Sequence, residues 1–126
     1  MQTIGFRDLF DHIADPRMTF SKRAEALSGQ DVELRGFLVA MHSDPRQIAL
    51  SNAAEVCPDC AEIPVPYVNL PGFSPGGQLF SPQAVRLKGK LSYGFAVAPE
   101  GYATFLRLEN ASIATGLKPG LMSGKS

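Results

Sequence analysis

Two segments, residues 32–38 and 85–91, share the pattern V-x-L-basic-G-x-L, and this repeat limits the possible folds more than any other feature. Apolar and charged residues alternate in both segments, which is typical of strands with one buried face. A glycine interrupts each strand in its interior, where it permits a bulge or a sharp coil. Strands that close a small barrel need such points. The repeat therefore predicts a small, strongly coiled barrel.

Further stretches of strand character bring the expected number of strands to five. Residues 47–53 form a short strand, and residues 64–70 form an edge or irregular strand because their two prolines cannot donate to a sheet. The last two strands, 84–98 and 103–114, form the best-defined pair. Their connection, Pro99-Glu100-Gly101, has the residues of a hairpin turn.

The N-terminal part of the chain has helical rather than strand periodicity. Residues 6–14 place apolar side chains at i, i+3, i+4 and i+7, which predicts a short amphipathic helix with Thr3 as its cap. Residues 22–28 predict a second short helix, with Ser21 as its N-cap and Gly29 as its stop. This part of the chain should pack against the barrel as a helical lead.

The predicted fold class is mainly β: a five-stranded OB-like Greek-key barrel with a short N-terminal α-helical segment. A chain of 126 residues suits a single domain. We expect one OB-like domain over residues 1–115, with a helical lead at 4–28 and a barrel at 30–115, and a flexible tail over 116–126. The predicted core consists of Phe6, Leu9, Phe10, Ile13, Val32, Leu34, Leu38, Val85, Leu87, Leu91, Leu106 and Leu108.

Residues 30–115 resemble a family of small uncharacterised bacterial proteins with OB-like barrels. The likeness rests on the V-x-L-basic-G-x-L strand, on Cys57-Pro58-Asp59-Cys60, on Ile63-Pro64-Val65-Pro66 and on the ending Leu106-Arg107-Leu108-Glu109-Asn110-Ala111. The resemblance implies the barrel but no particular activity. The chain departs from the general OB pattern, because residues 71–83 form a loop rich in proline and glycine where a helix usually lies between the third and fourth strands.

Composition and charge exclude several classes of protein. The hydrophobic fraction of 44% excludes a disordered chain, and a formal net charge of zero removes any global attraction to nucleic acid or anionic membranes. No run approaches the roughly 18 apolar residues of a membrane span. Charged residues at short intervals over 1–20 do not fit a secretory signal. Read as full length from Met1, the chain is expected in the cytoplasm; if a signal was trimmed, it is expected in the periplasm, as for the many members of this family that look exported.

The strongest chemical signal is the pair Cys57 and Cys60, which are the only cysteines. A two-residue spacer lets both thiolates face one ion, as in zinc sites. Structural zinc takes four ligands, so one such pair supplies half of them. His42 is a candidate third ligand and Asp59 a further one, or a second copy of the chain completes the site. We therefore predict a metal site at Cys57, Cys60 and His42, with zinc as its cofactor.

Two other interpretations of the cysteines stay open. Cys-Pro-x-Cys resembles glutaredoxin-type redox sites, but Pro64 and Pro66 prevent a useful helix after the pair, and such a helix is what lowers the thiol pKa in those sites. The two thiols can also be packing residues or a local disulfide, although so short a loop is worth only about 2 kcal/mol in the chain-entropy model. Thiol–disulfide exchange is therefore the alternative enzymatic function.

The charge distribution allows self-association. Residues 1–62 hold six basic and ten acidic side chains, whereas residues 63–126 hold six basic and two acidic ones. The two oppositely charged parts can attract each other within one fold, or they can support head-to-tail contact between copies. A homo-oligomer is therefore an expected form.

No motif points to a specific enzyme. Gly72-Phe73-Ser74-Pro75-Gly76 matches the G-x-S-x-G nucleophile pattern, but Pro75 has no N–H for an oxyanion hole and its surroundings oppose the helix that must follow. We find no convergent set of nucleophile, base and oxyanion donor, which favours a protein that is not an enzyme. The G-x-S-x-G match at residues 72–76 therefore indicates a flexible loop.

Nucleic-acid binding is a further alternative. Arg86, Lys88 and Lys90 project from one face of a predicted strand, and Phe37 and Phe105 are aromatic candidates for base stacking. Carboxylates such as Glu33 alternate into the same outward faces, so ion pairing across strands is a sufficient explanation and argues against this role. The sequence therefore favours a small binding or assembly module that binds metal through Cys57 and Cys60, with a redox protein or a single-stranded nucleic-acid-binding OB domain as alternatives.

Overall fold

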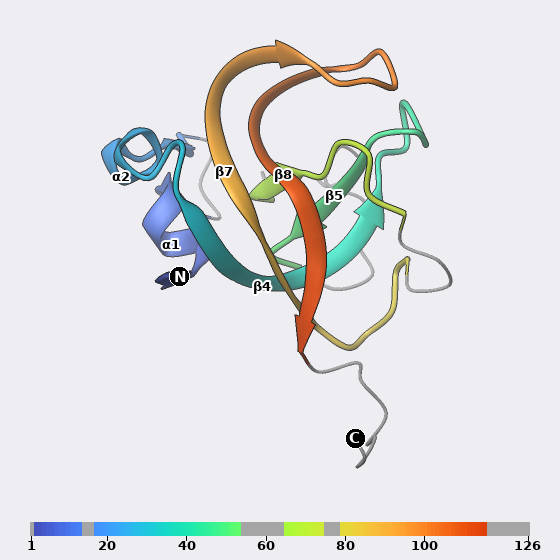
Figure 1. Cartoon of the computed structure of the whole chain (residues 1–126), viewed down its shortest axis with the longest axis horizontal. Helices are drawn as coiled ribbons and strands as arrows, with labels where there is room; N and C mark the ends of the chain where they lie inside the picture. Colours follow the sequence, from blue (N-terminus) through green and yellow to red (C-terminus); the bar gives the residue numbers. More distant parts are fainter. Residues whose placement is uncertain (1, 14–16, 54–64, 75–78, 116–126) are drawn as a thin grey trace.

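The computed structural model describes residues 2–13, 17–53, 65–74 and 79–115, and its main feature is a closed barrel of five strands (Figure 1). The sheet runs in the order β4-β5-β6-β8-β7, and β4 also pairs with β7, which closes the barrel. The strands are β4 (Asp31–Ala40), β5 (Ile48–Ser51), β6 (Tyr67–Asn69), β7 (Val85–Val97) and β8 (Ala103–Thr115).

The order of these strands is that of an OB barrel. Counted along the barrel from one to five, the strands neighbour one another as 1-2-3-5-4, and the third and fifth, β6 and β8, run parallel while the other pairs are antiparallel. This connectivity is a Greek key. The predicted fold class is therefore confirmed.

The two glycine-containing segments pair with each other. Leu34 lies opposite Leu87, and the glycine of each segment lies opposite the first valine of the other, Gly36 opposite Val85 and Gly89 opposite Val32. A Cβ atom on Gly36 would lie 2.7 Å from the carbonyl oxygen of Ser51 in β5. The repeat therefore builds the β4–β7 pair that closes the barrel.

Gly89 also lies too close to a neighbouring strand for a side chain, in this case β8, which pairs with β7. A Cβ atom at this position would lie 2.7 Å from the carbonyl oxygen of Glu109 in β8, and the β7–β8 register shifts between Lys88 and Lys90. Both glycines thus lie where a neighbouring strand passes too close for a side chain. The sequence predicted a bulge or a sharp coil at each glycine, and the register shift at Gly89 agrees with that prediction, whereas the close approach of a neighbouring strand is an additional finding.

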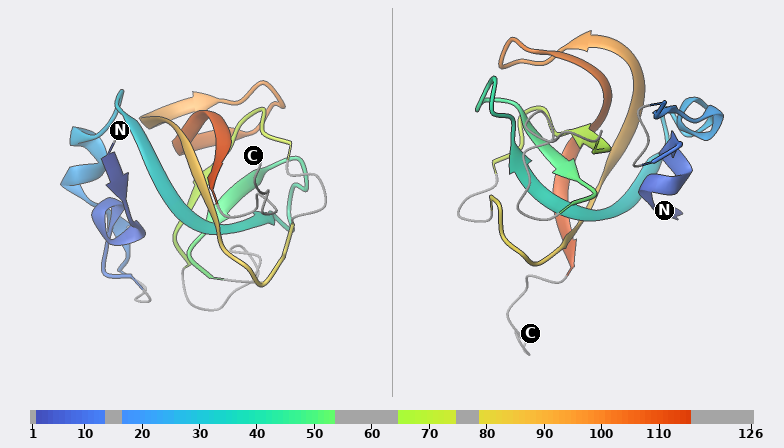
Figure 2. Two further views of the ribbon diagram at one scale, coloured as in Figure 1. Left: turned by 60° about the horizontal axis from the view of Figure 1, so that its bottom comes forward. Right: turned by 180° about the vertical axis from the view of Figure 1, so that it is seen from behind.

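The N-terminal elements lie together beside the barrel (Figures 1 and 2). β1 extends the sheet by pairing parallel to β4, and β2 and β3 form a separate two-stranded sheet. The elements are β1 (Gln2–Ile4), α1 (Phe6–Leu9), β2 (Phe10–Asp11), β3 (Thr19–Phe20) and α2 (Lys22–Ala26). Their apolar side chains join the barrel leucines in one core.

The predicted helix over 6–14 is wrong in its second half. The helix ends at Leu9, and Phe10 is extended and pairs with Phe20. Ser21 explains the early end: its hydroxyl donates to the carbonyl of Asp8 at 2.6 Å and its N–H donates to the carbonyl of Leu9 at 2.8 Å. These carbonyls would otherwise accept the bonds of the next helical turn.

The predicted caps have different outcomes. Thr3 is not a cap, because it lies in β1 and its hydroxyl donates to Glu33 of the neighbouring strand. Gly5 is the N-cap of α1 instead. Ser21 caps α2 as predicted, since its hydroxyl accepts from the N–H of Ala24, and Gly29 follows the helix with a φ of +88°.

The predicted core residues are buried, except that Ile13 is only partly buried at the edge of the core. Phe6, Leu9 and Phe10 from the N-terminal elements pack into the same core as the barrel leucines. The described parts of the loop over 71–83 contain no helix. No helix within the described ranges has the length and apolar character needed to cross a membrane.

Candidate functional site

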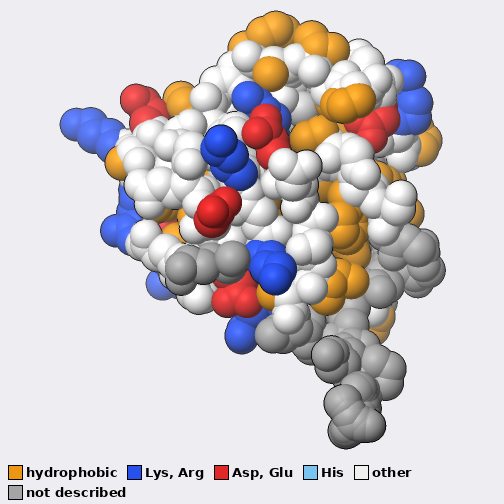
Figure 3. All heavy atoms as spheres, in the orientation of Figure 1, with side chains coloured by type: hydrophobic (Ala, Val, Ile, Leu, Met, Phe, Trp, Pro, Cys, Tyr) orange, Lys and Arg blue, Asp and Glu red, His pale blue; other side chains and the backbone are white. Residues whose placement is uncertain are grey.

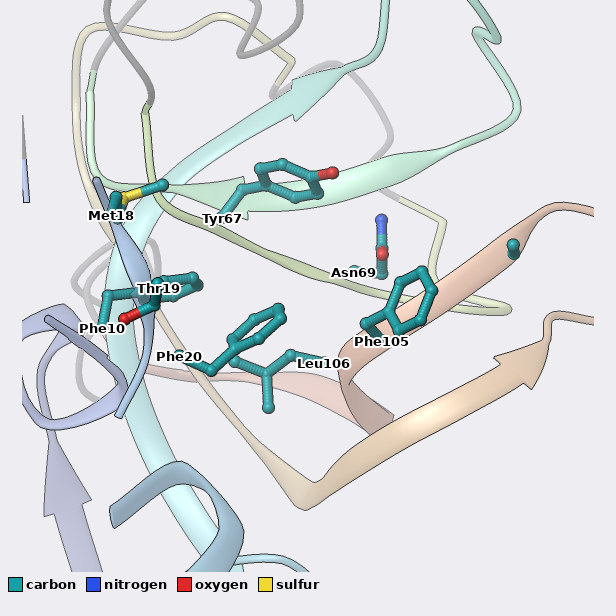
Figure 4. A pocket seen from close by; sticks show the side chains of 9 residues that line it. Phe10, Met18, Thr19, Phe20, Tyr67, Asn69, Phe105 and Leu106 are labelled. Carbon is teal, nitrogen blue, oxygen red and sulfur yellow. The ribbon is translucent and has the colours of Figure 1, made fainter. Parts of the chain in front are cut away.

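A pocket of about 490 Å³ lies where β6 and β8 separate and the β2–β3 hairpin covers the gap (Figure 4). The described residues pair β6 with β8 at one position only, Asn69 opposite Arg107. The barrel therefore opens beside this pair. The pocket is lined by Phe10, Met18, Thr19, Phe20, Tyr67, Asn69, Ala103, Phe105 and Leu106.

Four of the nine described lining residues of the pocket are aromatic. The Phe10 and Phe20 rings lie 5.3 Å apart between their centroids, and Phe20 makes an edge contact with Tyr93 at 5.5 Å. Phe20 is 38% exposed and Phe105 is 55% exposed, so both rings remain open to a ligand. Among the described residues, no charged side chain lines the pocket. Such a wall suits an uncharged, largely apolar group.

Asn69 is the unusual residue of this pocket. Its side chain lies between Tyr67 and Phe105 in Figure 4 and is only 3% exposed. Its amide nitrogen Nδ2 has no hydrogen-bond partner among the described residues. A buried donor without a partner costs about 1–3 kcal/mol. A ligand with an acceptor oxygen would remove this cost.

We expect the substitution Asn69→Leu to raise the free energy of unfolding by about 1 kcal/mol, because it removes a buried donor that the described residues leave without a partner and keeps a side chain of similar size. Urea denaturation measures the change. A clear loss of stability would show instead that the amide makes a necessary bond within the fold.

The apolar surface continues outside the pocket. Phe95 and Val97 of β7 are 64% and 62% exposed, and the Phe95 ring contacts Phe105 with centroids 5.5 Å apart. Orange spheres gather at the upper edge of Figure 3, over the region where Figure 1 shows β7 and β8 turning. Contiguous exposed apolar surface of this kind marks a binding site more often than a free surface.

The predicted metal site falls mostly outside the described residues. Cys57 and Cys60, with Asp59, belong to the segment 54–64, which the structure does not describe. His42 is exposed in the loop between β4 and β5. Across the described ranges, no three His, Asp or Glu side chains gather in a way that could hold a metal ion. The prediction for Cys57, Cys60 and His42 therefore stays a prediction.

The strand β5 separates His42 from the points where the cysteine segment leaves the barrel. The loop with His42 closes at one end of β5, where the N–H of Met41 donates to the carbonyl of Gln47. The chain continues toward the cysteines from the other end, where the N–H of Asn52 donates to the carbonyl of Pro66. The loop with His42 and the two ends of the segment that carries the cysteines therefore lie at opposite ends of β5, about 13 Å apart along the strand.

Two residues of the basic row on β7 face acidic residues, whereas the third, Arg86, lies opposite Arg35. Lys88 lies opposite Glu33 and Lys90 opposite Asp31 on the paired strand. Arg107 of β8 is bound to Glu109 at 3.1 Å and also donates to the carbonyl of Gly94. Carboxylates opposite lysines favour pairing within the sheet over contact with phosphates.

Hydrogen bonds connect the β4–β5 loop, the β7–β8 loop and Gly72. Arg46 donates to the Asp44 carboxylate at 2.9 Å and to the carbonyl of Glu100 at 2.9 Å, and Glu100 accepts from the N–H of Gly72 at 2.8 Å. Burial of the nearby Tyr102 hydroxyl, and after it the charges of Glu100 and Asp44, raise the pKa of Tyr102 to about 12. In OB barrels these β4–β5 and β7–β8 loops flank the usual ligand face.

The raised pKa of Tyr102 predicts a loss of stability in alkali. The folded state holds the proton of the Tyr102 hydroxyl more tightly than the unfolded state does. The contribution of this group to the free energy of unfolding is therefore complete below pH 10 and is lost as the pH rises through about 12. We expect Tyr102→Phe to lose less stability than the wild type between these limits. Thermal unfolding at stepped pH measures the slopes, and equal slopes would contradict the expectation.

The sequence pointed to Phe105 as a candidate binding residue but not to most of the other pocket residues. Asn69, Phe20 and Phe10 come together from three separate elements, and no short motif joins them. Phe95 and Val97 gave no signal, because they continue the apolar alternation of their strand and are exposed at and beyond the register shift between Tyr93 and Ala96. One signal was present: Phe105 is apolar at alternating spacing with Arg107 and Glu109. Apolar residues on the outward face of a strand point to a binding surface.

The strand order and the pocket in the barrel gap define an OB-like barrel with a candidate ligand site. Among solved structures, the chain is similar to a DUF3299 family protein from Pseudomonas aeruginosa, with a TM-score of 0.54 and 14% sequence identity over 90% of this chain and 96% of that chain. At this identity the likeness shows a shared fold. No family model and no curated protein matches the sequence.

Proposed function

We propose that the protein is a binding module that holds an uncharged, largely apolar ligand in the pocket between β6, β8 and the β2–β3 hairpin. The observation that carries this proposal is the buried Nδ2 donor of Asn69 within an aromatic wall. The rings bind apolar groups through area removed from water, and the amide selects ligands with an acceptor oxygen. The polar residues of the lining are Thr19, Tyr67 and Asn69. This set favours binding without chemical conversion.

A neutral fluorescent dye, Nile red, tests the proposal. The dye becomes bright in apolar surroundings and has a carbonyl oxygen, so we expect saturable binding with one site per chain. Phe105→Ser should weaken the affinity about tenfold, because it removes an aromatic ring from the wall. Ile113→Ser is the matched control, since Ile113 is an exposed apolar residue of the same strand outside the pocket. Equal affinities in both variants would contradict the proposal.

A second candidate function is zinc-dependent assembly through Cys57 and Cys60. It is supported by the C-x₂-C spacing, and two thiolates leave half of a tetrahedral site for His42 or for a second copy. The unequal charge of the two halves of the sequence is compatible with this association.

Metal analysis of the purified chain separates these arrangements. One zinc ion per two chains, lost together with dimerisation in Cys57→Ser, is the expected result for a shared site. One ion per chain that is lost in His42→Ala would support an internal site. If the purified protein contains no metal, and neither substitution changes its stability or its association, zinc binding is contradicted and the cysteines are packing residues.

A further inference from the structure

The strand β8 has an edge without a strand partner next to the pocket. β8 pairs with β7 from Ala103 to Thr115, whereas on its other side the described residues provide one pair, Asn69 with Arg107. The edge over 103–106 therefore has no pairing strand among the described residues. Such an edge is a template for another extended chain.

This edge forms part of the pocket wall. Ala103, Phe105 and Leu106 line the pocket from β8, and Tyr67 and Asn69 line it from β6 (Figure 4). Leu106 is 2% exposed and lies at the base, whereas Phe105 lies at the rim. A chain that pairs with the edge would therefore place its side chains directly in the pocket.

We infer that the ligand of this pocket is an extended peptide segment that adds to the barrel as a strand along 103–106 of β8. One large apolar side chain of the segment enters the aromatic pocket, and a backbone carbonyl accepts from Asn69 Nδ2. This inference rests on the proposed function, because it uses the same pocket and names its ligand class. In strand addition, main-chain hydrogen bonds supply affinity and pockets for alternate side chains supply specificity.

Three observations favour a peptide over a small molecule. The lining residues that the structure describes are uncharged, which matches an uncharged backbone. The open edge offers backbone groups that a compact apolar molecule would leave without partners. The apolar surface also extends beyond the pocket over Phe95 and Val97, which suits an elongated ligand with further apolar side chains.

Two short peptides test the inference on the full chain. The first alternates phenylalanine and threonine, with a lysine at each end for solubility and blocked termini. The second has the same sequence with N-methyl groups on alternate residues, so that one edge of its backbone cannot donate. We expect the first peptide to bind and the second to bind about tenfold more weakly or worse, because main-chain bonds are lost. Asn69→Leu should weaken the binding of the first peptide. Hydrogen exchange at the backbone amides of residues 103–106 of the protein reports whether the peptide pairs with this edge.

Slower hydrogen exchange of these amides in the complex is the expected result. Equal binding of both peptides, or binding without such protection, would overturn strand addition. Binding of Nile red without either peptide would overturn the peptide inference and leave the proposed function in place, whereas no binding of dye or peptide would overturn both. A chain that dimerises and protects 103–106 without peptide would assign the edge to a second copy and also overturn the inference.

Discussion

Replacement of Gly36 by valine is expected to lower the free energy of unfolding by about 3 kcal/mol, which is a large fraction of the roughly 5–15 kcal/mol of an ordinary domain. A Cβ atom at this position would lie 2.7 Å from the carbonyl oxygen of Ser51, 2.8 Å from Cγ of Leu50 and 3.1 Å from a ring carbon of Phe6. The carbonyl belongs to a paired strand and cannot turn aside. Relief of the contact requires β4 and β5 to separate.

Gly5→Ala is the matched control for this prediction. No atom lies within 4 Å of the Cβ position at Gly5, and its φ of −127° suits any residue. The free energy of unfolding of the Gly5→Ala variant should therefore differ from that of the wild type by about 1 kcal/mol at most. Gly89→Val should resemble Gly36→Val, since Glu109 presents the same obstacle. Urea denaturation followed by circular dichroism measures all three, and a stable Gly36→Val variant would contradict the steric role of the repeat.

Truncation of Leu34 or Leu87 to alanine is expected to cost about 2–5 kcal/mol each. Both side chains are fully buried, and they lie opposite each other at the centre of the β4–β7 pair. Their loss leaves a cavity where the two halves of the repeat meet. Because the two cavities join, we expect the double variant to cost less than the sum of the single variants by about 0.5 kcal/mol or more.

Denaturant midpoints of the two single variants and the double variant measure this coupling. Val97→Ala provides the control, because this side chain is 62% exposed on β7 and lies outside the core. Strictly additive costs for Leu34 and Leu87 would show that the two side chains do not share a packing site. Costs near zero would contradict the placement of the repeat in the core.

The barrel could be predicted because its strands carry local signals. The alternation around Leu34 and Leu87 gives each strand its buried face, and the proline and glycine of 99–101 give the last hairpin its turn, where the N–H of Gly101 donates to the carbonyl of Ala98 at 2.8 Å. These signals act over a few residues. The strand boundaries at β4, β7 and β8 therefore follow the predicted ranges closely.

The N-terminal elements show where local signals fail. Phe10 continues the helical spacing of residues 6–14, but it forms a strand with Phe20, and Ser21 takes the carbonyls that a longer helix would use. The pairing of β1 with β4 likewise requires that the barrel has already placed Glu33 and its neighbours in a strand with a free edge. Contacts between distant residues outweighed the weak helical propensity of a short segment.

The sequence by itself determined the buried faces of the barrel strands and the Cys57–Cys60 spacing that suggests zinc, because each depends on neighbouring residue types alone. The close approach of Ser51 to Gly36 and of Glu109 to Gly89 depends on the tertiary structure. Only the tertiary structure decided that Asn69 meets Phe10, Phe20 and Phe105 in one pocket and that the β8 edge opens onto it. The physical reason is that β6 and β8 separate after a single pair, and the width of that gap depends on how the closed barrel and the N-terminal hairpin pack together.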